Sequence, residues 1–332
     1  MTSLPWSRRA LLPWLALMVA SCTGTLDAGR DHPRGLLPVD QRNPVIIYND
    51  ASSDNWMGEY AALLANNGGP PLAAIVLTAS SYWPDANANA TGWSDLMTAA
   101  GESGLPGLPS VTLSGGKPFT RPTSGDVDDT PANNSAGGEL IVDLSRKLSL
   151  PWRPVVVLVG TQMTDVADAY LIDNSVVDRV VVVSSLGSYA APNGAMGPPN
   201  GELDSWADWI VAEKFQVVQV STFYDQTTDV TAADVPNLPS DPLGAEMAAK
   251  QPNLFTVTTA SDQVSVLSVA LPTFVTGVQR ASPDTSAAFD PTQGPPLVPT
   301  TDGNVWIVTQ IQSSLAGACL RLLLLAPGSS CS

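Results

Sequence analysis

Residues 44–55 read Pro-Val-Ile-Ile-Tyr-Asn-Asp-Ala-Ser-Ser-Asp-Asn, and a stretch with helical spacing follows at 56–64. The run 45–48 is apolar without alternation, which is typical of a strand buried on both faces of a parallel sheet. Asp50 and Asp54 are therefore expected on a loop between a strand and a helix, where open α/β sheets bind their ligands. Two carboxylates this close repel each other, so they commonly hold a cation or share a proton.

Further apolar or β-branched runs predict the rest of the sheet. They lie at 72–78, 155–159, 180–183, 217–220 and 305–308, and stretches with helical spacing separate them at 138–147, 164–171 and 205–215. This alternation predicts an α/β fold with an open, mostly parallel central sheet and helices on both faces. Stretch 114–137, rich in Gly, Pro, Asp and Asn, and stretch 222–254, rich in Thr, Asp and Pro, either overhang the ligand edge or are long surface loops.

The first residues predict export. Arg8 and Arg9 precede an apolar stretch at 10–20 that is too short to span a membrane and ends in Val-Ala-Ser-Cys at 19–22. This ending resembles a bacterial lipobox, which implies cleavage before Cys22 and a lipid on its thiol. An ordinary signal peptide with an incidental cysteine is the alternative.

These features give the expected organisation of the chain. A signal peptide at 1–21 and a polar tether at 22–43 precede one domain at 44–332. The protein is expected at the bacterial cell envelope, held on the periplasmic side of a membrane by lipidated Cys22, or free in the periplasm. In that oxidising compartment Cys319 and Cys331 are expected to form a disulfide.

Charge and histidine content exclude several functions. With 15 basic residues and a net charge of −16, the chain has no basic groove for nucleic acid. The single histidine, His32, precedes the expected domain. A Ser-His-Asp triad, a Cys-His dyad and a histidine-ligated zinc site are therefore excluded there. Chemistry in the domain would depend on carboxylates, amides, hydroxyls and a hard cation such as Ca²⁺.

Acidic residues from separate segments are expected at the same edge of the sheet. Glu202 and Asp204 stand at the start of one expected helix, and Asp262 stands at the start of another. Helix capping explains Asp204 or Asp262 taken alone. Together with Asp50 and Asp54, they predict a crevice that suits Ca²⁺.

Five segments, in order along most of the chain after residue 44, resemble the inosine–uridine-preferring nucleoside hydrolases. The motif Asp50-x-x-x-Asp54-Asn55 is similar to the family's Asp-x-x-x-Asp-Asp. Segments 108–118, 158–167, 201–208 and 261–262 are similar to its Gly-x-x-Lys/Arg-Pro-Leu, Leu-Gly-Pro-Leu-Thr-Asn-Leu-Ala, Ala-Glu-Phe-Asn-x-x-x-Asp and His-Asp. The resemblance implies calcium-dependent hydrolysis of the N-glycosidic bond of a nucleoside or a related ribosyl compound.

The resemblance also implies a role for each site residue. Asp50 would be the general base and a calcium ligand. Asn55, the backbone carbonyl of Thr164, and Asp262 would complete the calcium shell. The residues that would bind the sugar are Asp54, Ser81, Glu202 and Asp204.

Four positions depart from the family pattern. Asn55, Ser81, Asp204 and Ser261 stand where the family has Asp, Asn, Asn and His. The site thereby loses one negative charge at Asn55, and it loses the histidine that protonates the leaving base in some members. The alternative is a degenerate homologue that binds a sugar or nucleoside at the cell envelope without hydrolysing it. Whether the chain forms a homo-oligomer is left open.

Overall fold

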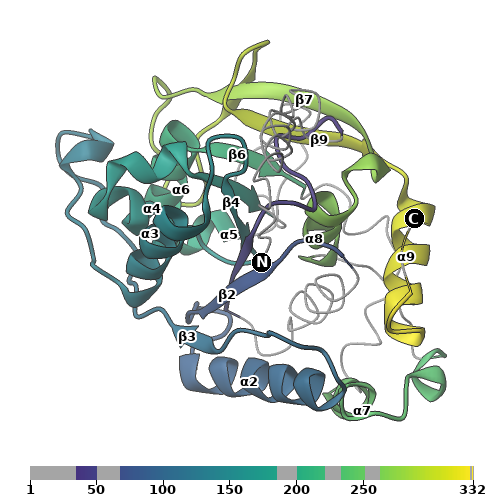
Figure 1. Ribbon diagram of the computed structural model, residues 1–332. Helices are drawn as coiled ribbons and strands as arrows, with labels where there is room; N and C mark the ends of the chain where they lie inside the picture. Colours follow the sequence, from purple (N-terminus) through teal and green to yellow (C-terminus); the bar gives the residue numbers. More distant parts are fainter. Residues whose placement is uncertain are drawn as a thin grey trace, which may run out of the picture. The chain divides into compact units, whose positions relative to one another are not determined.

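The computed structural model describes residues 35–50, 68–184, 200–220, 233–250, 262–329 and 331. These residues belong to one compact unit, 33–332, which is built on a nine-stranded sheet of order β3-β2-β1-β4-β5-β6-β9-β7-β8 (Figure 1). Its strands are β1 (Val45–Asn49), β2 (Leu72–Leu77), β3 (Val111–Leu113), β4 (Val155–Val159), β5 (Val180–Ser184), β6 (Gln216–Gln219), β7 (Val275–Pro283), β8 (Leu297–Pro299) and β9 (Val305–Ile311).

The predicted open, mostly parallel sheet is confirmed. Strands β1 to β6 and β9 pair in parallel, whereas β7 is antiparallel to both β8 and β9. The predicted apolar runs coincide with β1, β2, β4, β5, β6 and β9.

Helices cover both faces of the sheet, as predicted (Figure 1). One face carries α3 (Ala136–Leu148), α4 (Thr164–Ile172) and α6 (Ser205–Lys214), with α5 (Asn200–Leu203) leading into α6. The other carries α2 (Ala86–Glu102), α7 (Pro242–Lys250), α8 (Asp262–Ala270) and α9 (Ser313–Leu325). Each face of the sheet has its own apolar core. Successive side chains of β1 point into opposite cores: Ile46 and Tyr48 pack on the first face, and Val45 and Ile47 pack on the second.

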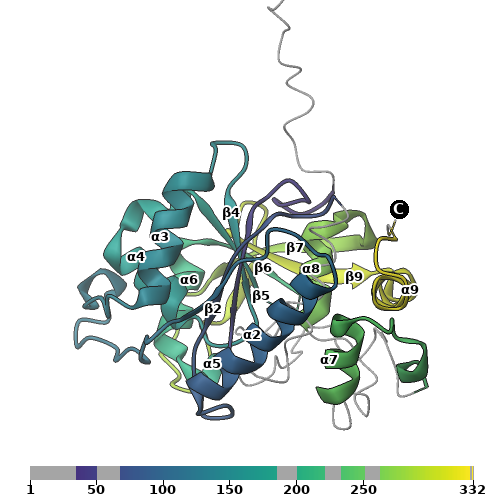
Figure 2. The same ribbon diagram turned by 60° about the horizontal axis from the view of Figure 1, so that its bottom comes forward.

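The strand order reverses beside β1. The chain runs from β1 outward through β2 to β3 and then returns to β4 on the other side of β1. Such a reversal opens a crevice at the carboxyl ends of the two central strands, which is where open α/β sheets bind ligands. In Figure 2 α5 lies at the lower edge of the sheet, while the purple segment 35–44 lies at the upper edge.

The packed domain begins before the predicted boundary at residue 44. Leu37 and Val39, which were expected at the end of a polar tether, are buried in the core on the α2 face. Asn43 donates a hydrogen bond from Nδ2 to the carbonyl of Pro154 (2.7 Å). The two apolar side chains fix residues 35–43 on the domain, so any tether ends before Gly35.

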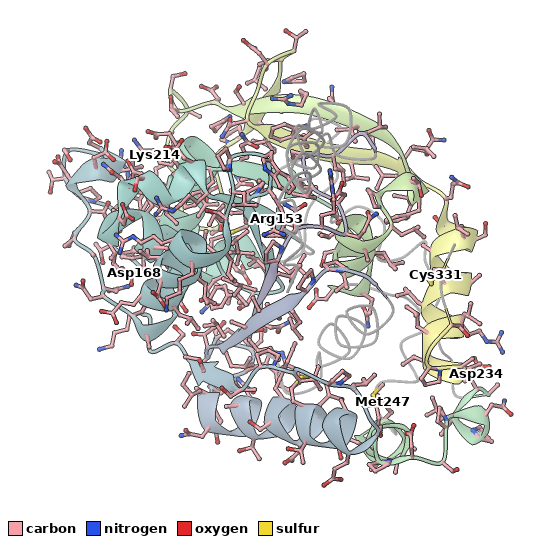
Figure 3. All side chains as sticks on the ribbon, in the orientation of Figure 1. Arg153, Asp168, Lys214, Asp234, Met247 and Cys331 are labelled. Atoms are coloured by element: carbon pink, nitrogen blue, oxygen red, sulfur yellow. A yellow bond between two sulfur atoms is a disulfide. The ribbon has the colours of Figure 1, made fainter. Side chains whose placement is uncertain are left out.

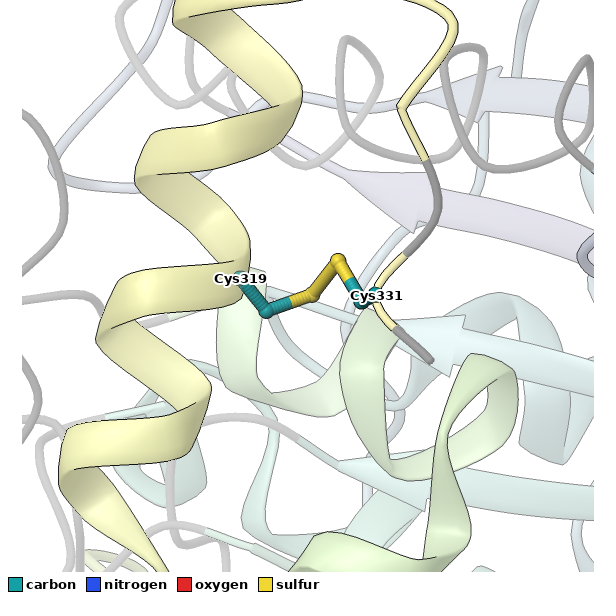
Figure 4. Close-up of a disulfide and its surroundings, with 2 residues drawn as sticks. All are labelled: Cys319 and Cys331. Atoms are coloured by element: carbon teal, nitrogen blue, oxygen red, sulfur yellow. A yellow bond between two sulfur atoms is a disulfide. The ribbon is translucent and has the colours of Figure 1, made fainter.

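The predicted disulfide is confirmed. Cys319 on α9 is bonded to Cys331 (Figure 4), and their Cα atoms lie 5.3 Å apart. The disulfide therefore holds the segment after α9 against that helix. No helix among the described residues has both the length and the apolar character needed to cross a membrane.

Reducing this disulfide is expected to lower the free energy of unfolding by about 3 kcal/mol, the loss of entropy that a loop of this size imposes on the unfolded chain. Denaturant titration with and without a reductant measures the difference. A Cys319→Ala/Cys331→Ala variant serves as the control and is expected to match the reduced protein and not to respond to reductant. Equal stability in both conditions would contradict the expectation.

Candidate active site

Asp50 follows β1 at the reversal of strand order and is 4% exposed. Burial raises the pKa of its carboxyl group, and hydrogen bonds with the hydroxyls of Ser80 and Thr161 partly offset this rise. Ser80 follows β2 and Thr161 follows β4. Residues from the ends of three adjacent strands therefore meet at Asp50.

The side chain of Asn49 connects Asp50 to Asp262. Its Oδ1 accepts a hydrogen bond from the backbone N–H of Asp50 (2.7 Å), and its Nδ2 donates to Oδ2 of Asp262 (3.0 Å), 213 residues further along the chain. Asp262 is the first residue of α8 and is buried. The structure thus brings together two of the acidic residues that the sequence predicted for one crevice.

Gly160, directly after β4, leaves the space in which these side chains meet. A Cβ atom at this position would lie 2.4 Å from Nδ2 of Asn49 and 2.5 Å from Oδ2 of Asp262. These distances are shorter than any van der Waals contact. A side chain here would therefore fill the cradle between β1, β4 and α8.

Gly160→Ala is accordingly expected to displace Asn49 and Asp262 and to lower the free energy of unfolding by about 1–3 kcal/mol, the usual cost of overpacking. Gly101→Ala is the matched control, because nothing lies within 4 Å of its added Cβ in α2. Denaturant titration of both variants measures the difference. Equal stability of the two variants would show that the cradle has room to spare.

A chain of polar side chains extends from Asp50. The hydroxyl of Thr161 donates to Oε1 of Gln162 (2.6 Å), and Nε2 of Gln162 donates to the carbonyl of Ala79 (2.9 Å). The hydroxyl of Thr161 also contacts the Asp50 carboxyl group, where it favours the charged form. This chain fixes the orientation of the Asp50 carboxyl group.

Asp204 is held by the protein on several sides. It is the N-cap of α6, where it accepts from the backbone N–H of Ala207 (3.1 Å), and it also accepts from the N–H of Phe119 (3.1 Å) and the hydroxyl of Thr164 (2.7 Å). Burial raises its pKa to about 6, although these bonds favour the charged form. Thr164, the first residue of α4, therefore lies next to Asp204. The capping explanation accounts for Asp204 without a sugar.

Glu202 accepts a hydrogen bond from the phenolic hydroxyl of Tyr82. The side chains of Tyr82 and Trp83 are 50% and 37% exposed. Their backbone N–H groups both donate to Oγ of Ser80 (3.2 and 3.1 Å), which is also the serine in contact with Asp50. A firmly held aromatic turn therefore borders the site.

The structure places the predicted serine differently. Ser81, which was expected to bind the sugar, is exposed, and its neighbour Ser80 contacts Asp50. Asn49, Ser80, Thr161, Gln162 and Tyr82 were not predicted as site residues. Their common feature in the sequence is that each lies within a few residues after the end of a predicted strand. Asp54, Asn55 and Ser261 lie outside the described residues.

The donor atoms that are described suit a hard cation. Asp50, Asp262 and the carbonyl of Thr164 offer oxygen only, which is what Ca²⁺ prefers, and the space beside Gly160 would be lost to a Cβ. In the described part of the chain, no three or more His, Cys, Asp or Glu side chains are grouped so as to hold a metal ion. A complete shell therefore depends on further donors, among which Asn55 was predicted.

The strand order and the helices on both faces define an open α/β protein, and its likeness to solved structures is to the nucleoside hydrolase-like fold. No family model and no curated protein matches the sequence. Among solved structures, a purine-preferring ribonucleoside hydrolase from Gardnerella vaginalis is similar, with 17% identity and a TM-score of 0.57 over 82% of this chain and 95% of that one. An inosine-guanosine nucleoside hydrolase shares 13% identity, with a TM-score of 0.60 over 85% and 99%.

The type III effector protein XopQ, complexed with adenosine diphosphate ribose, is also similar. It shares 13% identity, with a TM-score of 0.54 over 91% of this chain and 96% of that one. At such identities the similarity is one of fold.

Proposed function

We propose that this protein is a calcium-dependent hydrolase of the N-glycosidic bond of a nucleoside or a related ribosyl compound. The observation that carries the proposal is the Asn49 side chain, which joins Asp50 to Asp262 at the carboxyl edge of a nucleoside hydrolase-like sheet. The Asn49 side chain thereby links the backbone of Asp50 to the carboxyl group of Asp262 at the reversal of strand order, where open α/β sheets bind ligands.

In this proposal Asp50 accepts the proton of the attacking water. Ser80 and Thr161 orient its carboxyl group, and Glu202 at the start of α5 binds hydroxyls of the sugar. The anomeric carbon passes through a state that resembles an oxocarbenium ion, in which nearby carboxylates stabilise the positive charge. The bond between the anomeric carbon and the base nitrogen breaks, and the base leaves with the electron pair and takes a proton from solvent. The water oxygen, having given its proton to Asp50, bonds to the anomeric carbon.

Calcium would be held by Asp50, Asp262, the carbonyl of Thr164 and Asn55, and it would lower the pKa of a coordinated water.

We also propose that the chain is exported and anchored by a lipid on Cys22. The basic residues, short apolar stretch and small residues at 8–22 support this location.

Ligand binding without hydrolysis is the second candidate, because Asn55, Ser81, Asp204 and Ser261 depart from the family pattern and because Asp204 and Glu202 already have protein partners, so a sugar would not be held as hydrolysis requires. The carboxylate of Asp204 is satisfied by Phe119, Thr164 and Ala207, and Glu202 is bonded to Tyr82. Both residues were expected to hold the sugar. In this form the site would bind a nucleoside or another ribosyl compound, and XopQ complexed with adenosine diphosphate ribose supports testing ligands beyond nucleosides.

Release of the free base from a panel of nucleosides and adenosine diphosphate ribose, with calcium or with EDTA, separates these candidates. Hydrolysis is expected with calcium and is expected to be lost with EDTA, because the weakly acidic water needs the cation. Calorimetric binding of a panel member without turnover would instead support the second candidate. Neither turnover nor binding by a protein whose folded state is verified by circular dichroism would overturn both.

A further inference from the structure

An exposed tryptophan lies on the edge of the sheet opposite the candidate site. Trp152 is 45% exposed and Leu150 is 41% exposed. They belong to a tight turn before β4, which two backbone hydrogen bonds between Leu150 and Arg153 close (3.0 and 2.9 Å). The turn connects α3 to β4 at the amino ends of the strands, so its side chains are held on a rigid support.

Two arginines flank the indole ring of Trp152. The guanidinium carbon of Arg153 lies 5.6 Å from the ring centroid and that of Arg42 lies 5.9 Å from it. Arg42 is paired with Asp40, whereas Arg153 (Figure 3) forms no ion pair with any described residue. Leu150, Trp152, Arg42 and Arg153 are called the Trp152 patch below.

The chemistry of the Trp152 patch suits the surface of a lipid bilayer. Tryptophan side chains concentrate at the level of the lipid headgroups, and arginine is attracted to anionic lipids. The chain as a whole carries a net charge of −16, so most of its surface is repelled by such a membrane. An indole ring beside a guanidinium that donates a hydrogen bond to the carbonyl of Leu148, and which has no carboxylate partner among the described residues, is the kind of contact that such a protein needs there.

The described chain enters the domain beside this patch. Gly35 is the first described residue, and Asn43 ties the segment 35–44 to Pro154, next to the turn. Thirteen peptide units separate Cys22 from Gly35, which span at most about 45 Å when fully extended. A lipid on Cys22 would therefore keep the patch close to the bilayer, where effective concentrations on the order of millimolar make weak contacts sufficient.

We infer that the Trp152 patch rests on the surface of the bilayer to which Cys22 holds the chain. In Figure 2 the segment 35–44 lies at the upper edge and α5 at the lower edge. The candidate site therefore faces away from the membrane, toward soluble ligands. This inference rests on the proposed lipid anchor and not on the proposed hydrolysis.

Quenching of tryptophan fluorescence by brominated lipids tests the inference. The chain from Cys22 to Ser332 contains the whole compact unit, and Cys22 is its one cysteine outside the disulfide. Coupling Cys22 to a maleimide-bearing lipid in vesicles of anionic phosphatidylglycerol imposes the tether even if cells do not lipidate this residue. Mass spectrometry of the protein purified from membranes tests natural lipidation separately.

Brominated vesicles are expected to quench part of the emission of the tethered protein, and this quenching should be lost in Trp152→Phe. Trp83→Phe is the matched control, because Trp83 is comparably exposed at the opposite edge, and it should keep the quenching. Quenching that survives in Trp152→Phe, or that is lost in Trp83→Phe, would overturn the inference. A dimer in solution that Trp152→Phe converts to a monomer would also overturn it, because a second copy would then cover the patch.

Discussion

Asp50→Asn is expected to lower the rate of base release by about 10²–10⁴-fold, the usual contribution of a positioned general base. The amide keeps the size of the side chain but cannot accept a proton from water. The backbone N–H of Asp50 would still bond to Asn49, since that contact does not involve the Asp50 side chain. Turnover of the best member of the nucleoside panel, measured with saturating calcium, gives the ratio.

Two comparisons make this result specific to the site. Asp143→Asn changes an exposed carboxylate on α3 that pairs with Lys147, and it is expected to leave turnover unchanged. Circular dichroism and the denaturation midpoint check that Asp50→Asn is folded. Turnover within a few fold of the original protein would show that another group takes the proton, and the role of Asp50 would have to be abandoned.

The central strands were predictable because burial on both faces leaves an unbroken apolar run. Strands β1, β4 and β5 are fully buried along their length and therefore stand out in the sequence. Strand β7 consists mostly of half-buried residues without alternation, and β3 has only three residues. Neither gives a periodic pattern that is strong enough to separate a strand from a loop.

The acidic residues of the site were predictable, but the contacts among them were not. Asp50 and Asp262 follow from their positions at a strand end and a helix start. The neutral residues that hold them depend on the lateral register of the strands, which places Tyr48 beside Val159 and so brings Gly160 and Thr161 to the end of β1. Only the folded sheet shows that Asn49 reaches α8 and that Asp204 is occupied as a cap.

The same polar layer contains a carboxyl group that no described residue satisfies with a hydrogen bond. Asp208 on α6 is 0% exposed, and neither of its oxygen atoms has a hydrogen-bond partner within the described part of the chain. Burial raises its pKa well above the ordinary range, and the nearby carboxylate of Asp204 raises it further. Folding at neutral pH therefore requires Asp208 either to take up a proton or to keep a buried charge, and both lower the stability of the folded state.

Asp208→Asn is therefore expected to stabilise the protein, and increasingly so as the pH rises. Because the pKa of Asp208 is higher in the folded state, its unfavourable contribution is absent below the unfolded pKa near 4 and grows by up to about 1.4 kcal/mol per pH unit until the folded pKa is reached. The amide carries no charge, so its contribution is independent of pH.

Denaturant titrations from pH 4 to pH 8 measure the gap in the free energy of unfolding between the variant and the original protein. The gap is expected to be smallest at pH 4 and largest at pH 8. Asp143→Asn, at an exposed site, should change stability by less than about 0.5 kcal/mol across that range. A gap that does not widen with pH would mean that Asp208 is charged and paired in solution, and that its burial is not what limits stability at neutral pH.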